Sequence, residues 1–471
     1  MRKHRTPILA VNGIGRFWQF VAIEIDRHNY SHLPRCSLKF AVILVLHLAL
    51  IALVPLASAA DSASLAGHWE GFIEKQKAKL AIRVDIRDSS ANPAVLLDIP
   101  SLVYAWEPLP MKLEGTGVTA NFPFEIGEIP LKAENPDLLK GQTKEFTVEL
   151  RRSPAFQFRQ FEVTIPVEGT TLPGTLYEPP SATHAPAVVI AGGSGATRTG
   201  WTTRSWCDFF MRQGLACLVY DRRPEIAADG KPTAMATDSD DLISAVRFLE
   251  GRSEIDSVRT GIFAHSRGVW LAVRGAAHSD IVHFMVLVGA PATTPEQQEV
   301  DFVVGLMREE GRTESEMSEA MDYYRLYFHV AHSGRDWDKL RESVQSALHA
   351  KWGGYVDQPR ALADLAWWGA NGDFDNGGDL QLLKIPVYVF WGSADKVTPP
   401  LTHEPLLKEH LAHSHASSVT TRIFPGGDHR GEIKPGTDAQ GNFHWFGMAP
   451  GLIDALTEWI RTRVLVTALG S

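Results

Sequence analysis

A serine at position 266 stands where an apolar stretch meets a helix-forming stretch, a setting in which its hydroxyl could act as a nucleophile. Residues 261–268 read Gly-Ile-Phe-Ala-His-Ser-Arg-Gly, and a helix pattern begins near Val269. A strand that turns sharply into a helix at a serine holds the hydroxyl clear of the sheet. Small residues on either side of the serine, here Ala264 and Gly268, let the strand and the helix pass closely. The pattern therefore predicts a nucleophilic serine.

A serine hydroxyl near neutral pH needs a general base, and the base needs a carboxylate to orient it. Where such a turn carries the nucleophile, the order along the chain is Ser, then Asp or Glu, then His. Asp395 follows an apolar strand expected at 385–391, and His429 lies on a glycine-flanked loop after the next strand. Each could also be an ordinary loop residue, but their order after Ser266 favours a triad. Asp428 adjoins His429 and should point away from its ring, so Asp395 takes the orienting role.

A glycine-rich loop after another apolar strand could hold the negative charge that forms during acyl transfer. Residues 192–195 read Gly-Gly-Ser-Gly, and backbone N–H groups turned toward a developing oxyanion contribute about 3–4 kcal/mol each. The partner donor should be the N–H of Arg267, directly after the nucleophile. Ser194 is the favoured loop donor, and Gly193 or Gly195 fits as well. A phosphate-binding loop is excluded because no Gly-Lys-Ser/Thr follows.

Residues 158–465 together resemble the α/β-hydrolase fold, and in particular bacterial serine esterases related to dienelactone hydrolase and prolyl-peptidase domains. Residues 218–223, Leu-Val-Tyr-Asp-Arg-Arg, are similar to the Tyr-Asp-x-Arg-Gly segment of that family, with Pro224 in place of the glycine. Residues 240–249 resemble the helix that precedes the strand of the nucleophile. The resemblance implies an α/β fold with a mostly parallel sheet and an esterase-type activity.

The amino terminus has the pattern of an export signal. Basic residues precede an apolar run at 40–54, and Ala57-Ser-Ala59 matches an A-x-A cleavage site. The run is shorter than the roughly 20 residues that cross a membrane as a helix. We assign 1–60 to a signal peptide with a long n-region, with an uncleaved anchor as the alternative. The protein is then exported to the periplasm or beyond, with no stable membrane span after cleavage.

Composition excludes several classes of function. The chain has 471 residues, 44% of them apolar, and a net charge of −9, which argues against nucleic acid as a partner. Cys207 reads as helical and Cys217 as mid-strand, so we expect two buried thiols and neither cysteine catalysis nor a cysteine metal site. The acidic segment 373–379 has the wrong spacing for a calcium loop, and no metal or cofactor is expected.

The chain divides into further segments after the signal. Residues 61–152 show short alternating runs punctuated by Gly and Pro, which predicts a small all-β amino-terminal domain. Its Trp69-Glu-Gly71 start resembles a lipocalin-like β-domain, and the expected role is structural support, with a narrowed active site or a homodimer contact as alternatives. The α/β-hydrolase domain would then occupy 153–471. A helical lid is expected at about 294–380.

The residues predict a serine hydrolase that cleaves carboxylic esters of short to medium acyl chain. Three tryptophans of the expected lid, Trp352, Trp367 and Trp368, are candidates for an apolar acyl pocket, although such residues more often form the core of a lid. An exopeptidase or amidase on the same triad is the first alternative, and acyl transfer to an acceptor other than water is the second. A haloalkane or epoxide hydrolase would need a carboxylate at position 266 and is excluded.

Overall fold

The computed structural model describes residues 65–87, 93–114, 117–180 and 183–466 of the 471-residue chain. The predicted export signal lies outside these residues. Among the helices of the described part, none combines the length and the apolar character that crossing a bilayer requires.

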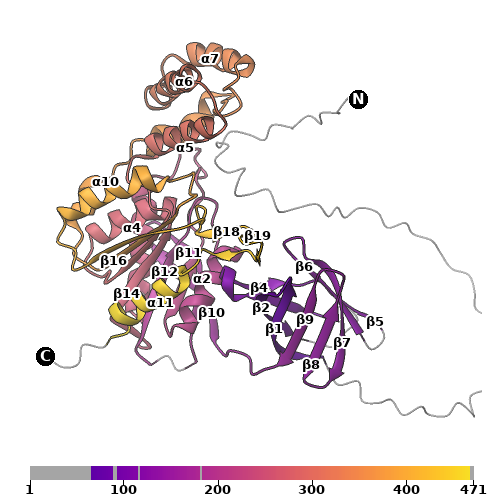
Figure 1. Cartoon of the computed structure of the whole chain (residues 1–471). Coiled ribbons are helices and arrows are strands. Elements are labelled where there is room, and N and C mark those ends of the chain that lie inside the picture. Colours follow the sequence, from indigo (N-terminus) through magenta and orange to yellow (C-terminus); the bar gives the residue numbers. More distant parts are fainter. Residues whose placement is uncertain (1–64, 88–92, 115–116, 181–182, 467–471) are drawn as a thin grey trace, which may run out of the picture.

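The amino-terminal strands form a nine-stranded sheet in the order β4-β3-β2-β1-β9-β8-β7-β6-β5, in which each neighbouring pair is antiparallel. Buried and more exposed residues alternate along β2, as the period-2 sequence pattern predicted. The sheet is curved and lies beside the rest of the molecule (Figure 1). Its strands are β1 (Gly67–Lys75), β2 (Ala78–Ile86), β3 (Val95–Ile99), β4 (Tyr104–Pro108), β5 (Met111–Glu114), β6 (Gly117–Phe122), β7 (Gly127–Asn135), β8 (Leu138–Gln142) and β9 (Thr147–Arg152).

A second, eight-stranded sheet has the order β10-β11-β13-β12-β14-β15-β16-β17. The β10–β11 and β11–β13 pairs are antiparallel, and the five pairs from β13 through β17 are parallel. Counted along the chain, this order is 1-2-4-3-5-6-7-8 with the second strand reversed, which is the arrangement of the α/β-hydrolase fold. The strands are β10 (Arg159–Val167), β11 (Thr170–Glu178), β12 (Ala185–Ala191), β13 (Ala216–Tyr220), β14 (Ile255–His265), β15 (Met285–Val288), β16 (Val387–Gly392) and β17 (Val419–Phe424).

Helices cover both faces of the eight-stranded sheet, so successive residues of its central strands enter different cores. Val188 of β12 packs with α2 and α11, whereas Val189 packs with helices of the opposite face. α2 (Trp201–Arg212) and α11 (Leu452–Arg463) cover one face. The other face is covered by α3 (Met235–Glu250), α4 (Arg267–Ala277), α9 (Gly377–Leu382) and α10 (Pro400–Ala412).

Helices inserted between β15 and β16 build a core of their own, in which Tyr324, Tyr327 and Trp352 are buried. Thr313 begins α6 with a capping box to Glu316, which satisfies backbone N–H groups of its first turn. α5, α6 and α7 project beyond the sheet (Figure 1). The inserted elements that form this core are α5 (Pro295–Glu309), α6 (Glu314–Ser333), α7 (Trp337–His349), the 3₁₀ turn η3 (Leu362–Leu365) and α8 (Ala366–Asn371), whereas α9, inserted between the same strands, covers the sheet.

Two short antiparallel sheets of two strands each follow the last strand of the eight-stranded sheet. They are formed by β18 (Glu432–Ile433) with β21 (Gly447–Met448), and by β19 (Gly436–Thr437) with β20 (Phe443–His444).

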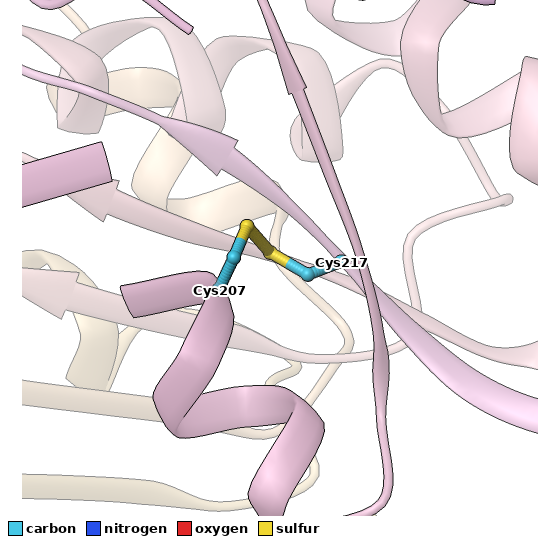
Figure 2. Close-up of a disulfide and its surroundings, with 2 residues drawn as sticks. All are labelled: Cys207 and Cys217. Carbon is cyan, nitrogen blue, oxygen red and sulfur yellow. A yellow bond between two sulfur atoms is a disulfide. The ribbon is translucent and has the colours of Figure 1, made fainter. Parts of the chain in front are cut away.

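Cys207 and Cys217 form a disulfide, which corrects the expectation of two buried thiols (Figure 2). The sequence placed Cys207 on a helix and Cys217 in a strand, and both lie there, on α2 and β13. Because α2 packs directly on the strand that follows it, the two Cα atoms are 5.3 Å apart, within the span that a disulfide bridges. The bond ties α2 to the sheet.

Candidate active site

Ser266 lies at the sharp turn between β14 and α4. Its backbone has φ 55° and ψ −124°, a positive φ that non-glycine residues seldom adopt and that often marks functional turns. The turn is held by two hydrogen bonds: the Ser266 N–H donates to the Val288 carbonyl at 3.0 Å, and the Val269 N–H donates to the Ser266 carbonyl at 2.8 Å. The local sequence thus folds into a turn that presents the hydroxyl at the carboxyl end of the sheet.

The residues two positions before and after Ser266 are small, and the close approach of neighbouring backbones explains why. A Cβ at Gly268 would lie 1.9 Å from the Ala191 carbonyl oxygen, so only glycine fits there. Ala264 is fully buried and pairs with Ala191 of the neighbouring strand. The alanine at position 264 is therefore compatible with the turn.

Asp395 and His429 lie side by side at the carboxyl ends of β16 and β17. His429 Nδ1 is 3.0 Å from Asp395 Oδ1 and 2.9 Å from Oδ2, which makes this nitrogen the donor to the carboxylate. The backbone N–H groups of Val397 and Thr398 donate to Asp395 Oδ1 at 2.9 Å, and the Thr398 hydroxyl donates to Oδ2 at 2.7 Å. The carboxylate is therefore held in one orientation toward the ring.

The pKa of Asp395 is lowered although its side chain is fully buried. Burial acts to raise the pKa, but the charge of His429, the hydrogen bond from His429 and the hydrogen bonds from Thr398 together outweigh it. Asp395 is thus ionised throughout the range in which an imidazole titrates. An anionic partner at Nδ1 fixes the tautomer that leaves Nε2 free to accept a proton.

His429 Nε2 is buried and has no hydrogen-bond partner within the described part of the chain. His429 and Ser266 line the same cavity. A buried nitrogen without a partner is unusual, because such groups are generally satisfied unless a functional role leaves them open. An imidazole nitrogen in this state can accept the proton of a hydroxyl nucleophile.

Two further residues position His429 and were not predicted from the sequence. Gly289 follows β15 with φ 53°, and a Cβ there would lie 2.7 Å from His429 Cε1, so the ring occupies the space of a missing side chain. His265 donates from Nε2 to the His429 carbonyl oxygen at 3.2 Å. Burial, followed by the charge of His429, lowers the pKa of His265 to about 3, so His265 stays neutral. In the sequence, the Gly289-Ala-Pro291 run directly after a strand was the signal that could have indicated the role of Gly289.

The glycine loop 192–195 lies against Ser266, and Ser194 lines the cavity together with Ser266. A Cβ at Gly193 would lie 3.2 Å from Ser266 Cβ, so this backbone approaches closely because it carries no side chain. The Arg222 guanidinium donates to the carbonyl oxygens of Gly192, at 3.3 Å, and Gly193, at 2.7 Å. These bonds fix which way the loop peptides face.

The Arg267 side chain is directed away from the cavity. It is 3% exposed, its guanidinium donates to Asp238 at 3.0 Å and to Glu225, and it lies over the Trp367 ring at 5.1 Å. Its backbone opens α4 directly after Ser266. The structure therefore leaves only the backbone N–H of Arg267 available for the oxyanion role that the sequence suggested.

The cavity at Ser266 has a volume of about 150 Å³ and mostly apolar walls. None of its lining residues comes from the helical insertion, so the tryptophans at 352, 367 and 368 do not form this pocket; those at 201 and 206, on α2, line it instead. Besides the glycine loop, Ser266, His265 and His429, the lining is Leu102, Val103, Ile190, Ala196, Trp201, Thr202, Thr203, Trp206, Phe263, Val288, Val397, Arg430, Glu432 and Met448.

One charged pair borders the cavity. The Arg430 guanidinium donates to the Glu432 carboxylate at 2.9 Å and lies 5.2 Å from the centre of the Trp201 ring. Burial raises the pKa of Glu432 to about 7, against the opposing effect of Arg430. The pair gives an otherwise apolar pocket a polar edge.

No family model and no curated protein matches the chain. Among solved structures, a dienelactone hydrolase from Anabaena variabilis is similar over 65% of this chain and 99% of its own, with 17% identity and a TM-score of 0.38. A cold-adapted esterase from an Arctic intertidal metagenomic library is similar over 66% of this chain and 97% of its own, with 11% identity and a TM-score of 0.38. Independently of these similarities, the strand order and the strand–Ser266–helix turn give this chain the α/β-hydrolase fold.

Proposed function

We propose that this protein is a serine hydrolase that cleaves carboxylic esters of short to medium acyl chain. The observation that carries the proposal is the state of His429. Its Nδ1 is bonded to a buried, anionic Asp395, and its Nε2 has no partner among the described residues and belongs to the cavity that Ser266 lines. An imidazole held in this way is suited to accept the proton of Ser266.

In the proposed reaction, Ser266 Oγ bonds to the acyl carbon while His429 Nε2 takes the hydroxyl proton. The carbonyl oxygen becomes an oxyanion that the N–H groups of Arg267 and of the Ser194 loop stabilise. His429 then passes the proton to the departing alcohol, which leaves an acyl group on Ser266. A water molecule then gives a proton to His429 and attacks the acyl carbon. As the bond between the acyl carbon and Ser266 Oγ breaks, His429 passes this proton to Oγ, which releases the acid and restores the serine hydroxyl.

The size and polarity of the cavity favour esters over peptides. A pocket of about 150 Å³ with mostly apolar walls suits a short acyl chain. An exopeptidase that acts from the amino terminus needs an anionic group to bind the free ammonium of its substrate. The one carboxylate that borders the cavity within the described residues, Glu432, is paired with Arg430, and its pKa is raised to about 7.

The proposal is tested by hydrolysis of 4-nitrophenyl esters from acetate to decanoate by the full chain and by Ser266→Ala. We expect turnover of the shorter esters and a loss of about 10⁴-fold or more in kcat with Ser266→Ala. Ser244→Ala is the matched control, because the Ser244 hydroxyl donates to the Asp240 carbonyl in its own helix, and Ser244 does not line the cavity. Retained turnover in Ser266→Ala would refute the proposal, and turnover of aminoacyl 4-nitroanilides in preference to esters would assign a peptidase instead.

A further inference from the structure

A turn of the nine-stranded sheet forms part of the wall of the Ser266 cavity. The turn consists of η2 (Pro100–Leu102) and Val103, between β3 and β4, and we call it the η2 turn. Leu102 and Val103 line the cavity that also contains Ser266 and His429. The amino-terminal sheet thus reaches the site about 160 residues before the nucleophile in the chain, at a place where sequence spacing offers no signal.

Val103 adopts a backbone conformation that its residue type disfavours. Its φ of 49° and ψ of 53° place a β-branched residue in the left-handed region, where the Cβ is crowded. The Val103 N–H donates to the Pro100 carbonyl at 3.2 Å, and the side chain is 8% exposed. Such strain persists where the surroundings determine the conformation, and it gathers at functional sites.

The η2 turn bridges two hydrophobic cores. Leu102 belongs to the core of the nine-stranded sheet, whereas Val103 packs into the core of the eight-stranded sheet with Tyr177, Phe210 and Met448. Both side chains are therefore held in place by packing within a hydrophobic core. Because their cores are close-packed, the side chains of Leu102 and Val103 cannot easily move aside to make room for a longer ligand.

β4 docks on α2 directly after the η2 turn. The Ala105 N–H donates to Ser205 Oγ of α2 at 2.9 Å, and Glu107 pairs with Arg204 of α2. The Trp106 ring stacks on Phe158, which precedes β10, with centroids 4.9 Å apart. α2 also supplies cavity-lining tryptophans, and its disulfide fixes it to β13. The η2 turn and the cavity-lining tryptophans of α2 therefore share one support.

The segment after His429 holds the η2 turn from the other side. Gly447 passes so close that a Cβ there would lie 3.0 Å from the Ser101 carbonyl oxygen. Phe446 is buried in the core of the nine-stranded sheet, and Trp445 Nε1 donates to the Ala78 carbonyl at 2.9 Å. The amino-terminal sheet and the segment at 445–447 therefore pack into each other beside the cavity.

We propose that Leu102 and Val103 determine which acyl chains this hydrolase accepts, by closing the acyl pocket with side chains from the amino-terminal sheet. The inference rests on the proposed function and extends it to substrate selection. Truncating either side chain removes wall on the cavity side, so longer acyl chains gain room. Enlarging Leu102 does the reverse.

The test compares kcat/KM for 4-nitrophenyl octanoate and acetate in the full chain and in Leu102→Ala, Val103→Gly and Leu102→Phe. Glycine adopts a positive φ without the Cβ penalty, so Val103→Gly removes the side chain and the strain together and should fold. We expect the octanoate-to-acetate ratio to rise about tenfold in Leu102→Ala and Val103→Gly and to fall in Leu102→Phe. If Leu102 had a purely structural role, its smaller and larger replacements would not shift the octanoate-to-acetate ratio in opposite directions.

Matched controls come from the same sheet. Val118→Ala and Leu139→Ala truncate side chains that are 2% and 1% exposed in the same core and do not line the cavity. They should lower the melting temperature and leave the ratio unchanged. An unchanged ratio in the η2-turn variants, with esterase activity that still depends on Ser266, would overturn the inference and leave the proposed function intact.

A second measurement does not depend on turnover. Ethyl and octyl fluorophosphonates react covalently with nucleophilic serines, and intact mass gives the rate of modification of Ser266 in each variant. The octyl-to-ethyl ratio should shift as the ester ratio does, and identical ratios in wild type and variants would contradict the inference. Absence of modification of wild-type Ser266 by either reagent would overturn the proposed function and the inference with it.

Discussion

Asp395 and Asp428 are both near His429, and their contacts separate their roles. Asp395 faces the imidazole at 2.9 Å. Asp428 instead accepts the N–H groups of Arg430, at 2.9 Å, and Glu432, at 3.0 Å, and so shapes the loop that carries His429. In the proposed mechanism Asp395 orients the base, whereas Asp428 holds the backbone of the loop that carries it.

Replacement of these two aspartates therefore has different consequences. Asp395→Asn should lower kcat by about 10⁴-fold, because an amide can hold the imidazole in the wrong tautomer. Asp428→Asn should lower the melting temperature and reduce kcat much less. Steady-state kinetics with thermal melting separates the two effects, and a larger loss of kcat at Asp428 would reverse the assignment.

Gly289 tests how closely the base is positioned. Gly289→Ala would place a Cβ 2.7 Å from His429 Cε1 and displace the ring, so we expect kcat to fall on the order of 100-fold with little change in KM. The pH profile of kcat should change as well, because the contact of His429 with Asp395 is altered. Gly305→Ala is the control: its Cβ would meet nothing within 4 Å, and alanine favours the helix there. Equal kinetics in the two variants would contradict the role of Gly289.

At the scale of elements, Arg222 determines how the loop at 192–195 presents its N–H groups. Arg222→Lys replaces a planar fork, which reaches both the Gly192 and the Gly193 carbonyl, with a single ammonium. We expect kcat to fall 10- to 100-fold, roughly the effect of weakening one oxyanion donor. Arg223→Lys is the matched control, since Arg223 bonds Asp241 and the Glu168 carbonyl outside the cavity. It should alter the melting temperature but not kcat, and equal kcat in both variants would exclude this role of Arg222.

The sequence predicted the local elements better than their packing. Ala264 and Gly268 indicated a strand–turn–helix at Ser266, and the structure has one. Such a turn is visible in the sequence because the close crossing of strand and helix requires small residues there. The sequence could predict that Asp395 and His429 lie at the same edge of the sheet, because each follows a strand of one parallel sheet. The Cys207–Cys217 bond depends on how a helix packs on the strand after it, and the pocket tryptophans depend on which helix faces the cavity. Neither arrangement has a signature in sequence spacing.

At the scale of the whole molecule, the contact between the nine-stranded sheet and α2 contains a titratable group. Burial raises the pKa of Asp98 to about 7, and the charge of Asp208 adds to the effect. The Trp106 N–H, which donates to Asp98 at 2.8 Å, and Arg212, at 3.6 Å, act in the opposite direction. The native state therefore binds a proton at Asp98 more tightly than the unfolded chain, whose aspartates titrate near 3.8.

This difference predicts the pH dependence of stability. Between about pH 4 and 7 the native state holds more protons at Asp98, so its contribution to the free energy of unfolding falls as the pH rises. Asp98→Asn keeps an oxygen for the Trp106 N–H and removes the charge. Its melting temperature should exceed that of wild type at pH 8 by more than at pH 5. Asp137→Asn, on an exposed residue of the same sheet, should show no such difference, and a constant offset in Asp98→Asn would contradict the prediction.

The most direct test of the central claim is to identify the covalent intermediate. The full chain is mixed with 4-nitrophenyl butyrate, quenched in acid during turnover and analysed by intact and peptide mass. The account predicts a burst of 4-nitrophenol and one butyryl group on the peptide that contains Ser266, both absent in Ser266→Ala. Turnover of the ester by Ser266→Ala, or a butyryl group on another residue of the active wild-type protein, would contradict it.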